Sequence, residues 1–162
     1  MTRGRTHTRR AFSLLEAVVA IVVLAISVPA TVSWLGESAA RRADAVNAVR
    51  ASSLATGVME TILADVASPH ASLGFGALAS EATYLDTPAT GLRARLAPMS
   101  DGYAALGFTY DVDIGPLVDS AGAVNADAGL NIFRVVGVRV TFPSQADSTP
   151  IDVRIEAMVT SL

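Results

Sequence analysis

Residues 17–36 read AVVAIVVLAISVPATVSWLG, twenty residues without a single charged side chain. Twenty helical residues at about 1.5 Å each span roughly 30 Å, which is the thickness of the hydrocarbon core of a bilayer. A helix buried in a protein core is the alternative, but such a helix rarely continues for five turns without a polar stripe. The stretch therefore predicts a membrane-spanning helix near the N-terminus.

The charges on either side of this stretch predict its orientation. Four of the twelve basic residues fall within residues 1–10, and the rest of the chain carries eight Arg against fifteen Asp and Glu. By the positive-inside rule, residues 1–10 lie in the cytoplasm and everything after Trp34 lies outside it. The acidic body also argues against a nucleic-acid partner, because phosphate binding needs a basic face.

Glu16 interrupts the apolar run, because residues 11–15 before it are also uncharged. A carboxylate in hydrocarbon costs about 2.5–3.5 kcal/mol on insertion scales. One interpretation is that the side chain reaches the inner headgroups, which its place near the start of the helix allows. The other interpretation is that Glu16 has a charged partner.

Residues 9–20 read RRAFSLLEAVVA: basic residues, a small residue, Phe, a hydroxyl residue, two aliphatic residues, Glu and then an apolar helix. This order resembles the type III (prepilin) signal of type IV pilins and type II secretion pseudopilins. In that family, a membrane peptidase cuts between the small residue, usually Gly, and Phe, and methylates the new amino group. The resemblance implies a leader of residues 1–11, cleavage between Ala11 and Phe12, and N-methylation of Phe12.

The resemblance also implies a partner for Glu16. Cleavage would leave a positive amino terminus on Phe12, and an unpaired charge is expensive in apolar surroundings. A neighbouring subunit shifted along a filament can bring its amino terminus to Glu16. We therefore expect three partners: prepilin peptidase, the inner (cytoplasmic) membrane, and other pilins or pseudopilins that contact the N-terminal helix.

Residues 37–67 continue in helix formers before Pro69 ends the helix. Their apolar residues, three to five positions apart in the main, predict one packed stripe, and the charged residues mostly fill the remaining surface. The stripe consists of Val46, Val49, Leu54, Val58, Ile62, Leu63 and Val66. We expect one helix from about residue 12 to residue 66, with residues 12–36 in the membrane and a kink or local unwinding at Pro29.

The end of the chain alternates apolar and polar residues over 108–114, 136–142 and 151–159. Period-two alternation predicts three strands with one buried face, and the turn-rich links 115–130 and 143–150 suit an antiparallel meander. Arg134 lies two residues before Val136, so a strand that included Arg134 would place it on the face predicted to be buried. We therefore expect the second strand to begin nearer Val135 than Ile132. The predicted fold is α+β, pilin-like, with a long helix packed on a three-stranded antiparallel sheet. Its domain covers residues 37–162, with a variable, irregular region at 67–103 and the sheet at about 104–162.

The sequence contains no recognisable catalytic constellation, so we do not expect an enzyme. The chain has no Cys, His7 lies in the leader, and His70 follows a Pro in a loop, where we interpret it as a surface residue. We expect no cofactor. Asp119, Asn125 and Asp127 form the one calcium candidate, because they place oxygen ligands in a Gly-containing loop. Their spacing does not match an EF-hand, and Asp and Asn are also common in turns for conformational reasons.

Among pilin-like subunits, the chain is similar to the minor pseudopilin of the I type in type II secretion and to pilus-modification minor pilins. The similarity rests on size, on the segment ASSLATGVMETILADV at 51–66 and on three terminal strands. It implies a subunit that initiates or caps a short periplasmic filament. The alternative is an exported or membrane-anchored periplasmic binding domain, because residues 8–12 also resemble a twin-arginine signal and residues 28–30 a signal-peptidase site. Glu16, however, interrupts the apolar region that a twin-arginine signal needs.

Overall fold

The computed structural model describes residues 13–70 and 72–161 of the chain. The predicted leader 1–11 and the predicted cleavage residues Ala11 and Phe12 lie outside the described residues. The chain divides into two compact units, Met1–Ala40 and Arg41–Leu162. Helix α1 (Leu14–Val66) contributes its N-terminal part to the first unit and its C-terminal part to the second.

Helix α1 is 53 residues long and contains Pro29. Helical structure continues through Pro29 without interruption, so the expected local unwinding is absent, and a kink there stays a prediction. Two hydroxyls near Pro29 bond to carbonyls four residues earlier: Ser27 Oγ donates to Val23 O at 2.7 Å, and Thr31 Oγ1 donates to Ser27 O at 2.8 Å. Such bonds satisfy the hydroxyl groups of Ser and Thr within an apolar helix.

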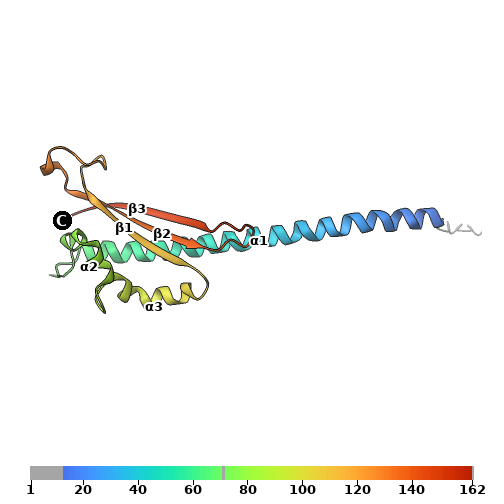
Figure 1. The fold of residues 1–162 in the computed structure, drawn as a ribbon, viewed down its shortest axis with the longest axis horizontal. Coiled ribbons are helices and arrows are strands. Elements are labelled where there is room, and N and C mark those ends of the chain that lie inside the picture. The colour runs from blue at the N-terminus through green and yellow to red at the C-terminus, as the bar shows by residue number, and fades with distance from the viewer. Residues whose placement is uncertain (1–12, 71, 162) are drawn as a thin grey trace, which may run out of the picture. The chain divides into compact units, whose positions relative to one another are not determined.

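The second unit contains an antiparallel sheet of order β1-β2-β3. Its strands are β1 (Thr109–Val118), β2 (Phe133–Phe142) and β3 (Ile151–Thr160). One face of the sheet forms a single core with α1, in which Leu54, Val58 and Ile62 join Val136, Val138 and Val140. Figure 1 shows the C-terminal part of α1 lying along the sheet. This arrangement confirms the predicted α+β class.

The buried face of α1 differs from the predicted stripe. Val46, Val49 and Leu63 are exposed, whereas Ala51, Ala55 and Met59 are buried. Residues 49 and 51 lie about 200° apart around a helix, so both cannot face the same sheet. The small side chains of Ala51 and Ala55 allow the sheet to approach, and the burial of this face decides the rotation of the helix.

Residues 67–103 are more regular than predicted. They contain the 3₁₀ helix η1 (Phe75–Ala79), α2 (Glu81–Asp86) and most of α3 (Leu92–Ala104). The many Pro and Gly residues predicted an irregular chain, but α3 includes Pro98 and has Leu92 and Leu96 buried in the core. Burial of these leucines outweighs the low helix propensity of Pro98.

Two strand boundaries also differ from the predictions. Strand β1 extends past residue 114 to Val118, with a bulge between Ile114 and Leu117. Strand β2 begins at Phe133 and contains Arg134, which the parity argument had placed before the strand. Arg134 Nη1 donates to Gly115 O at 2.8 Å, within the bulge. The backbone carbonyl at the bulge is thus a polar partner for Arg134, which lies at a position where the alternation of the strand predicts a buried apolar residue.

Candidate functional site

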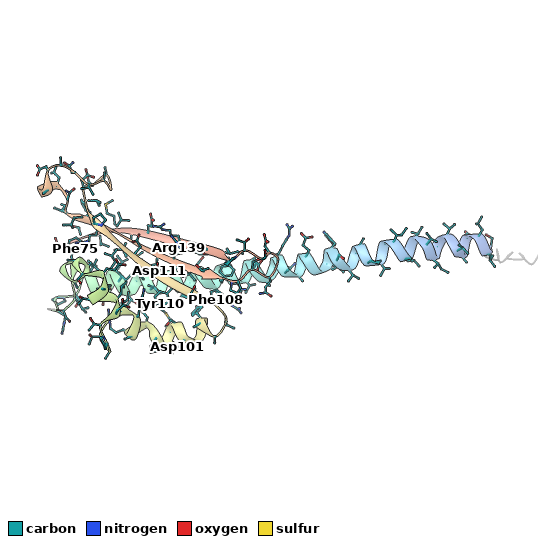
Figure 2. The ribbon with its side chains drawn as sticks, in the orientation of Figure 1. Phe75, Asp101, Phe108, Tyr110, Asp111 and Arg139 are labelled. Carbon is teal, nitrogen blue, oxygen red and sulfur yellow. The ribbon has the colours of Figure 1, made fainter. Side chains whose placement is uncertain are left out.

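The N-terminal part of α1 presents a continuous apolar surface. Its large aliphatic side chains are 49–84% exposed from Leu14 to Leu35, and side chains project from it in all directions (Figure 2). An apolar window of this helix has a mean hydropathy of 2.4, with none of it buried. Isolated water-soluble proteins rarely expose so large an apolar area. The helix is therefore long and apolar enough to cross a membrane.

Glu16 lies in the first turn of this helix, and its side chain is exposed. The backbone N–H of Glu16 donates to Ser13 Oγ at 3.2 Å, so Ser13 caps the helix. Ser followed by Glu three residues later is the spacing of a capping box, a signal that our sequence analysis missed. A negative charge in the first turn is also favourable next to the helix dipole. Glu16 thus lies where its charge also favours the start of the helix.

A buried charged cluster connects α1, α2 and α3. Asp65 is only 6% exposed and accepts two hydrogen bonds from Arg95, one of them from Nη1 at 2.8 Å. The Tyr84 hydroxyl donates to Asp65 Oδ2 at 2.6 Å. Burial, followed by the contact with Asp65, raises the pKa of Tyr84, and the hydrogen bond to Asp65 raises the pKa of Arg95. This network anchors the α2–α3 region to the long helix.

A second buried carboxylate, Asp44, connects α1 to the β2–β3 link. Its two oxygens accept hydrogen bonds from Ser144 Oγ at 2.7 Å, Gln145 N at 2.7 Å and Ala146 N at 3.1 Å. The Gln145 N–H, followed by the Ser144 hydroxyl, holds the pKa of Asp44 below its ordinary value. The sequence predicted that the charged residues of this helix mostly fill the surface outside the apolar stripe. Arg41, Arg42, Arg50 and Glu60 are exposed as predicted, whereas Asp44 and Asp65 are buried, because partners far along the chain compensate their burial.

We predict that Asp44 gives the fold an acid-sensitive contribution. Because the folded state lowers the pKa of Asp44, its stabilisation is complete above the unfolded value of about 3.9 and is lost as the pH falls through the lower folded value. The urea midpoint of Asp44→Asn should lie below that of the unmodified chain by a constant amount between pH 7 and pH 5. The difference should shrink below about pH 4. Urea unfolding followed by circular dichroism at each pH measures the difference between the two midpoints. An unchanged difference at pH 3 would contradict an acid-sensitive contribution from Asp44.

The structure brings the calcium candidates together in one loop but uses their oxygens internally. Asp119 Oδ1 accepts from the backbone N–H groups of Ala121 and Ala123, and its Oδ2 accepts from Asn125 Nδ2 at 3.1 Å. Asn125 Oδ1 accepts from Asp127 N, and Asp127 Oδ1 accepts from Gly129 N. The bonds to Asp119, first that from Asn125, lower its pKa. These contacts support the conformational interpretation of the three residues.

Within residues 13–70 and 72–161, no three His, Cys, Asp or Glu side chains gather in a way that could hold a metal ion. His70 is exposed, and its Nδ1 lies 2.9 Å from Ser72 Oγ. The expectations of no enzymatic activity and no cofactor stay predictions.

Fold and site together define a class: an α+β domain carried on an N-terminal helix that can span a membrane. Comparisons with protein-family models, curated proteins and solved structures found no match to this chain.

Proposed function

We propose that this chain is a structural subunit of a pilus or pseudopilus, matured by cleavage between Ala11 and Phe12 and methylation of Phe12. The observation that supports the proposal most strongly is the position of Glu16. A single carboxylate lies in the first turn of a helix whose N-terminal part, residues 14–36, is otherwise uncharged and exposed. An amino terminus on Phe12 of a neighbouring subunit is a suitable counter-charge for it.

Assembly into a filament would both cover the exposed aliphatic side chains of this helix and give Glu16 a counter-charge. In the membrane, lipid covers the aliphatic side chains; in a filament, the helices of neighbouring subunits cover them. The cost of burying Glu16 is offset only if a positive charge reaches it, so pairing would select correctly placed neighbours. The folded unit 41–162 would then lie on the outer side of the membrane or on the filament surface.

Within this class we propose a minor pseudopilin that initiates or caps a type II secretion pseudopilus. The support is the small α+β domain, with three terminal strands and a helix segment 51–66 packed on them. The subunit would reside in the inner membrane with its N-terminus in the cytoplasm, and it would contact prepilin peptidase and other pilins or pseudopilins.

The N-terminal residue and intact mass of the membrane-bound protein test this proposal. In cells with a prepilin peptidase, we expect a chain that begins at Phe12 and carries the mass of one added methyl group. Peptidase-deficient cells provide the control, and Ala11→Gly should be processed at least as completely. An uncleaved membrane-bound chain in both cell types would indicate a simple anchored domain. A soluble chain beginning at Thr31 would indicate a cleavable export signal, and either result would refute the filament subunit.

A further inference from the structure

The loop between β1 and β2 and the adjoining end of β3 carry four exposed aliphatic side chains, which we name the apolar tip. It comprises Val124, Leu130, Ile132 and, from β3, Met158. Val124 is 69% exposed and Leu130 is 53% exposed. A Cβ added to Gly122 would lie 3.5 Å from Met158 Cε, so the loop lies against the end of β3. Aliphatic side chains gathered at the end of a loop are typical of an interaction surface.

The apolar tip is held rigid by the polar residues of its own loop. Asn131 Oδ1 accepts from Asn125 N at 2.8 Å, and Asn131 Nδ2 donates to Asn125 O at 2.9 Å. These two bonds join the two legs of the loop at the residues next in sequence to Val124, Leu130 and Ile132. A loop that is already ordered loses little entropy on binding. The two hydrogen bonds between Asn125 and Asn131 therefore order the loop that carries the contact surface.

The tip has an acidic surround. Between Gly115 and Ile132 the chain carries Asp119 and Asp127 and no basic residue. It has no Trp, Tyr, Arg or Lys there, the residues that anchor proteins at a bilayer surface, and anionic headgroups would repel it. Its chemistry instead suits an apolar hollow with a positive charge at the rim.

The other end of the sheet contains such a hollow, between α1 and α3. It has a volume of about 260 Å³ and is lined by Arg50, Met99, Gly102, Tyr103 and Leu106. Leu106 is 57% exposed, and Arg50 forms no ion pair in the described part of the chain. Tyr103 packs edge-on against Phe108 at 5.8 Å between ring centroids, which ties the wall of the hollow to the core (Phe108 is labelled in Figure 2).

The tip and the hollow lie at opposite ends of β1. Leu106 comes just before Thr109, the first residue of β1, and Asp119 comes just after Val118, its last residue. Ten residues at about 3.3 Å each separate the two surfaces by roughly 33 Å along the strand. Within one unit the two surfaces therefore cannot meet.

We propose that the apolar tip of one copy docks into the α1–α3 hollow of a second copy. Aliphatic side chains would fill the hollow, and Arg50 of one copy would face Asp127 or Asp119 of the other. Such a contact is head-to-tail: each copy keeps one free tip and one free hollow, so the contact repeats along the strand direction. The proposal rests on the proposed function only in assigning a filament subunit, because it makes a second copy a neighbour in the filament. A mixed dimer would support a subunit present in several copies, and its absence would leave the initiating or capping subunit standing.

Disulfide cross-linking of the full chain in mild detergent tests this contact. The chain has no Cys, so introduced thiols are the only ones present. We expect a Val124→Cys chain mixed with a Leu106→Cys chain to give a mixed dimer on mild oxidation. A chain carrying both substitutions should give a ladder of higher oligomers. Ser148→Cys, in the exposed β2–β3 link, is the control and should give no adduct with Leu106→Cys.

Charge variants make the test specific for the proposed pairing. Asp127→Arg or Arg50→Asp alone should lower the yield of mixed dimer several-fold, and one of each in the two chains should restore it. Leu130→Asp in the tip of the Val124→Cys chain should lower it at least about tenfold. Protease resistance of residues 41–162 shows that each variant is folded.

Absence of the mixed dimer, or an adduct formed equally well by Val124→Cys alone, would overturn the head-to-tail contact. The N-terminal analysis of the mature chain is independent of this result. A chain that begins at Phe12 but forms no mixed dimer would refute the contact and leave the filament subunit standing. A mixed dimer from a chain that is never cleaved would support the contact and refute the filament subunit.

Discussion

A Glu16→Gln chain is expected to insert into the membrane normally and yet to be recovered without its partner pilins. Gln has nearly the same size and can serve at the same position of a capping box, so the helix start at Ser13 should be preserved. The substitution removes only the charge. Without a carboxylate, a neighbouring amino terminus would remain unpaired in apolar surroundings, which costs several kcal/mol. We expect co-purification with other pilin-like subunits to fall at least about tenfold.

Two matched variants separate pairing from the other roles of Glu16. Glu60→Gln removes an exposed carboxylate from a later part of α1 and should leave co-purification unchanged. Ser13→Ala removes the cap while keeping the Glu16 charge, and it should weaken the helix start without abolishing assembly. If Ser13→Ala lowers assembly as much as Glu16→Gln does, assembly depends on the integrity of the helix start and the pairing role of Glu16 is not supported. Membrane fractionation confirms insertion of all three.

The second large effect is expected at Asp65. In Asp65→Ala, the guanidinium of Arg95 and the hydroxyl of Tyr84 lose their buried partner. Loss of one partner of a buried ion pair destabilises a protein by about 3–5 kcal/mol. Because the Arg95 side chain is 30% exposed, water can partly replace Asp65, and we expect about 3 kcal/mol. That is a large part of the stability of a small domain. Pulse proteolysis of the full chain in urea, followed by the survival of the folded unit 41–162, measures this loss in the free energy of unfolding.

The control for Asp65 is an Asp–Arg ion pair on the surface, in which the carboxylate accepts a single hydrogen bond. Arg93 Nη1 lies 2.8 Å from Asp86 Oδ1, and both side chains are about half exposed. Asp86→Ala should therefore cost less than about 1 kcal/mol. Asp65→Asn, which keeps the volume and part of the hydrogen bonding, should fall between the two. Equal losses for Asp65→Ala and Asp86→Ala would show that the cluster contributes no more than a surface pair.

Much of the fold could be predicted because its patterns are local. The twenty uncharged residues 17–36 indicate a membrane-spanning helix whatever surrounds them, and strict alternation in the three terminal segments indicates strands. Helix α3 was missed for the opposite reason. Its sequence contains Pro98 and Gly102, and only the burial of Leu92 and Leu96 against the rest of the unit makes it a helix.

The candidate sites divide in the same way. Glu16 stands out in the sequence because a charge is unusual in an apolar run. Asp44 and Asp65 do not stand out, because the residues that make their burial tolerable lie 100 and 30 positions away, at Ser144 and Arg95. The oxygens of Asp119 and Asn125 had two possible uses, and the tertiary structure shows them bonded to their own loop.

By itself, the sequence determined the membrane-competent helix, the three strands and the unusual carboxylate at Glu16, since each depends on neighbours within a few turns or a few strand residues. Only the tertiary structure decided which face of α1 is buried, which acids are internal, and that an apolar tip and an apolar hollow lie at opposite ends of β1. The physical reason is that burial depends on contacts between distant segments. An Asp costs several kcal/mol or almost nothing according to what those segments bring to it.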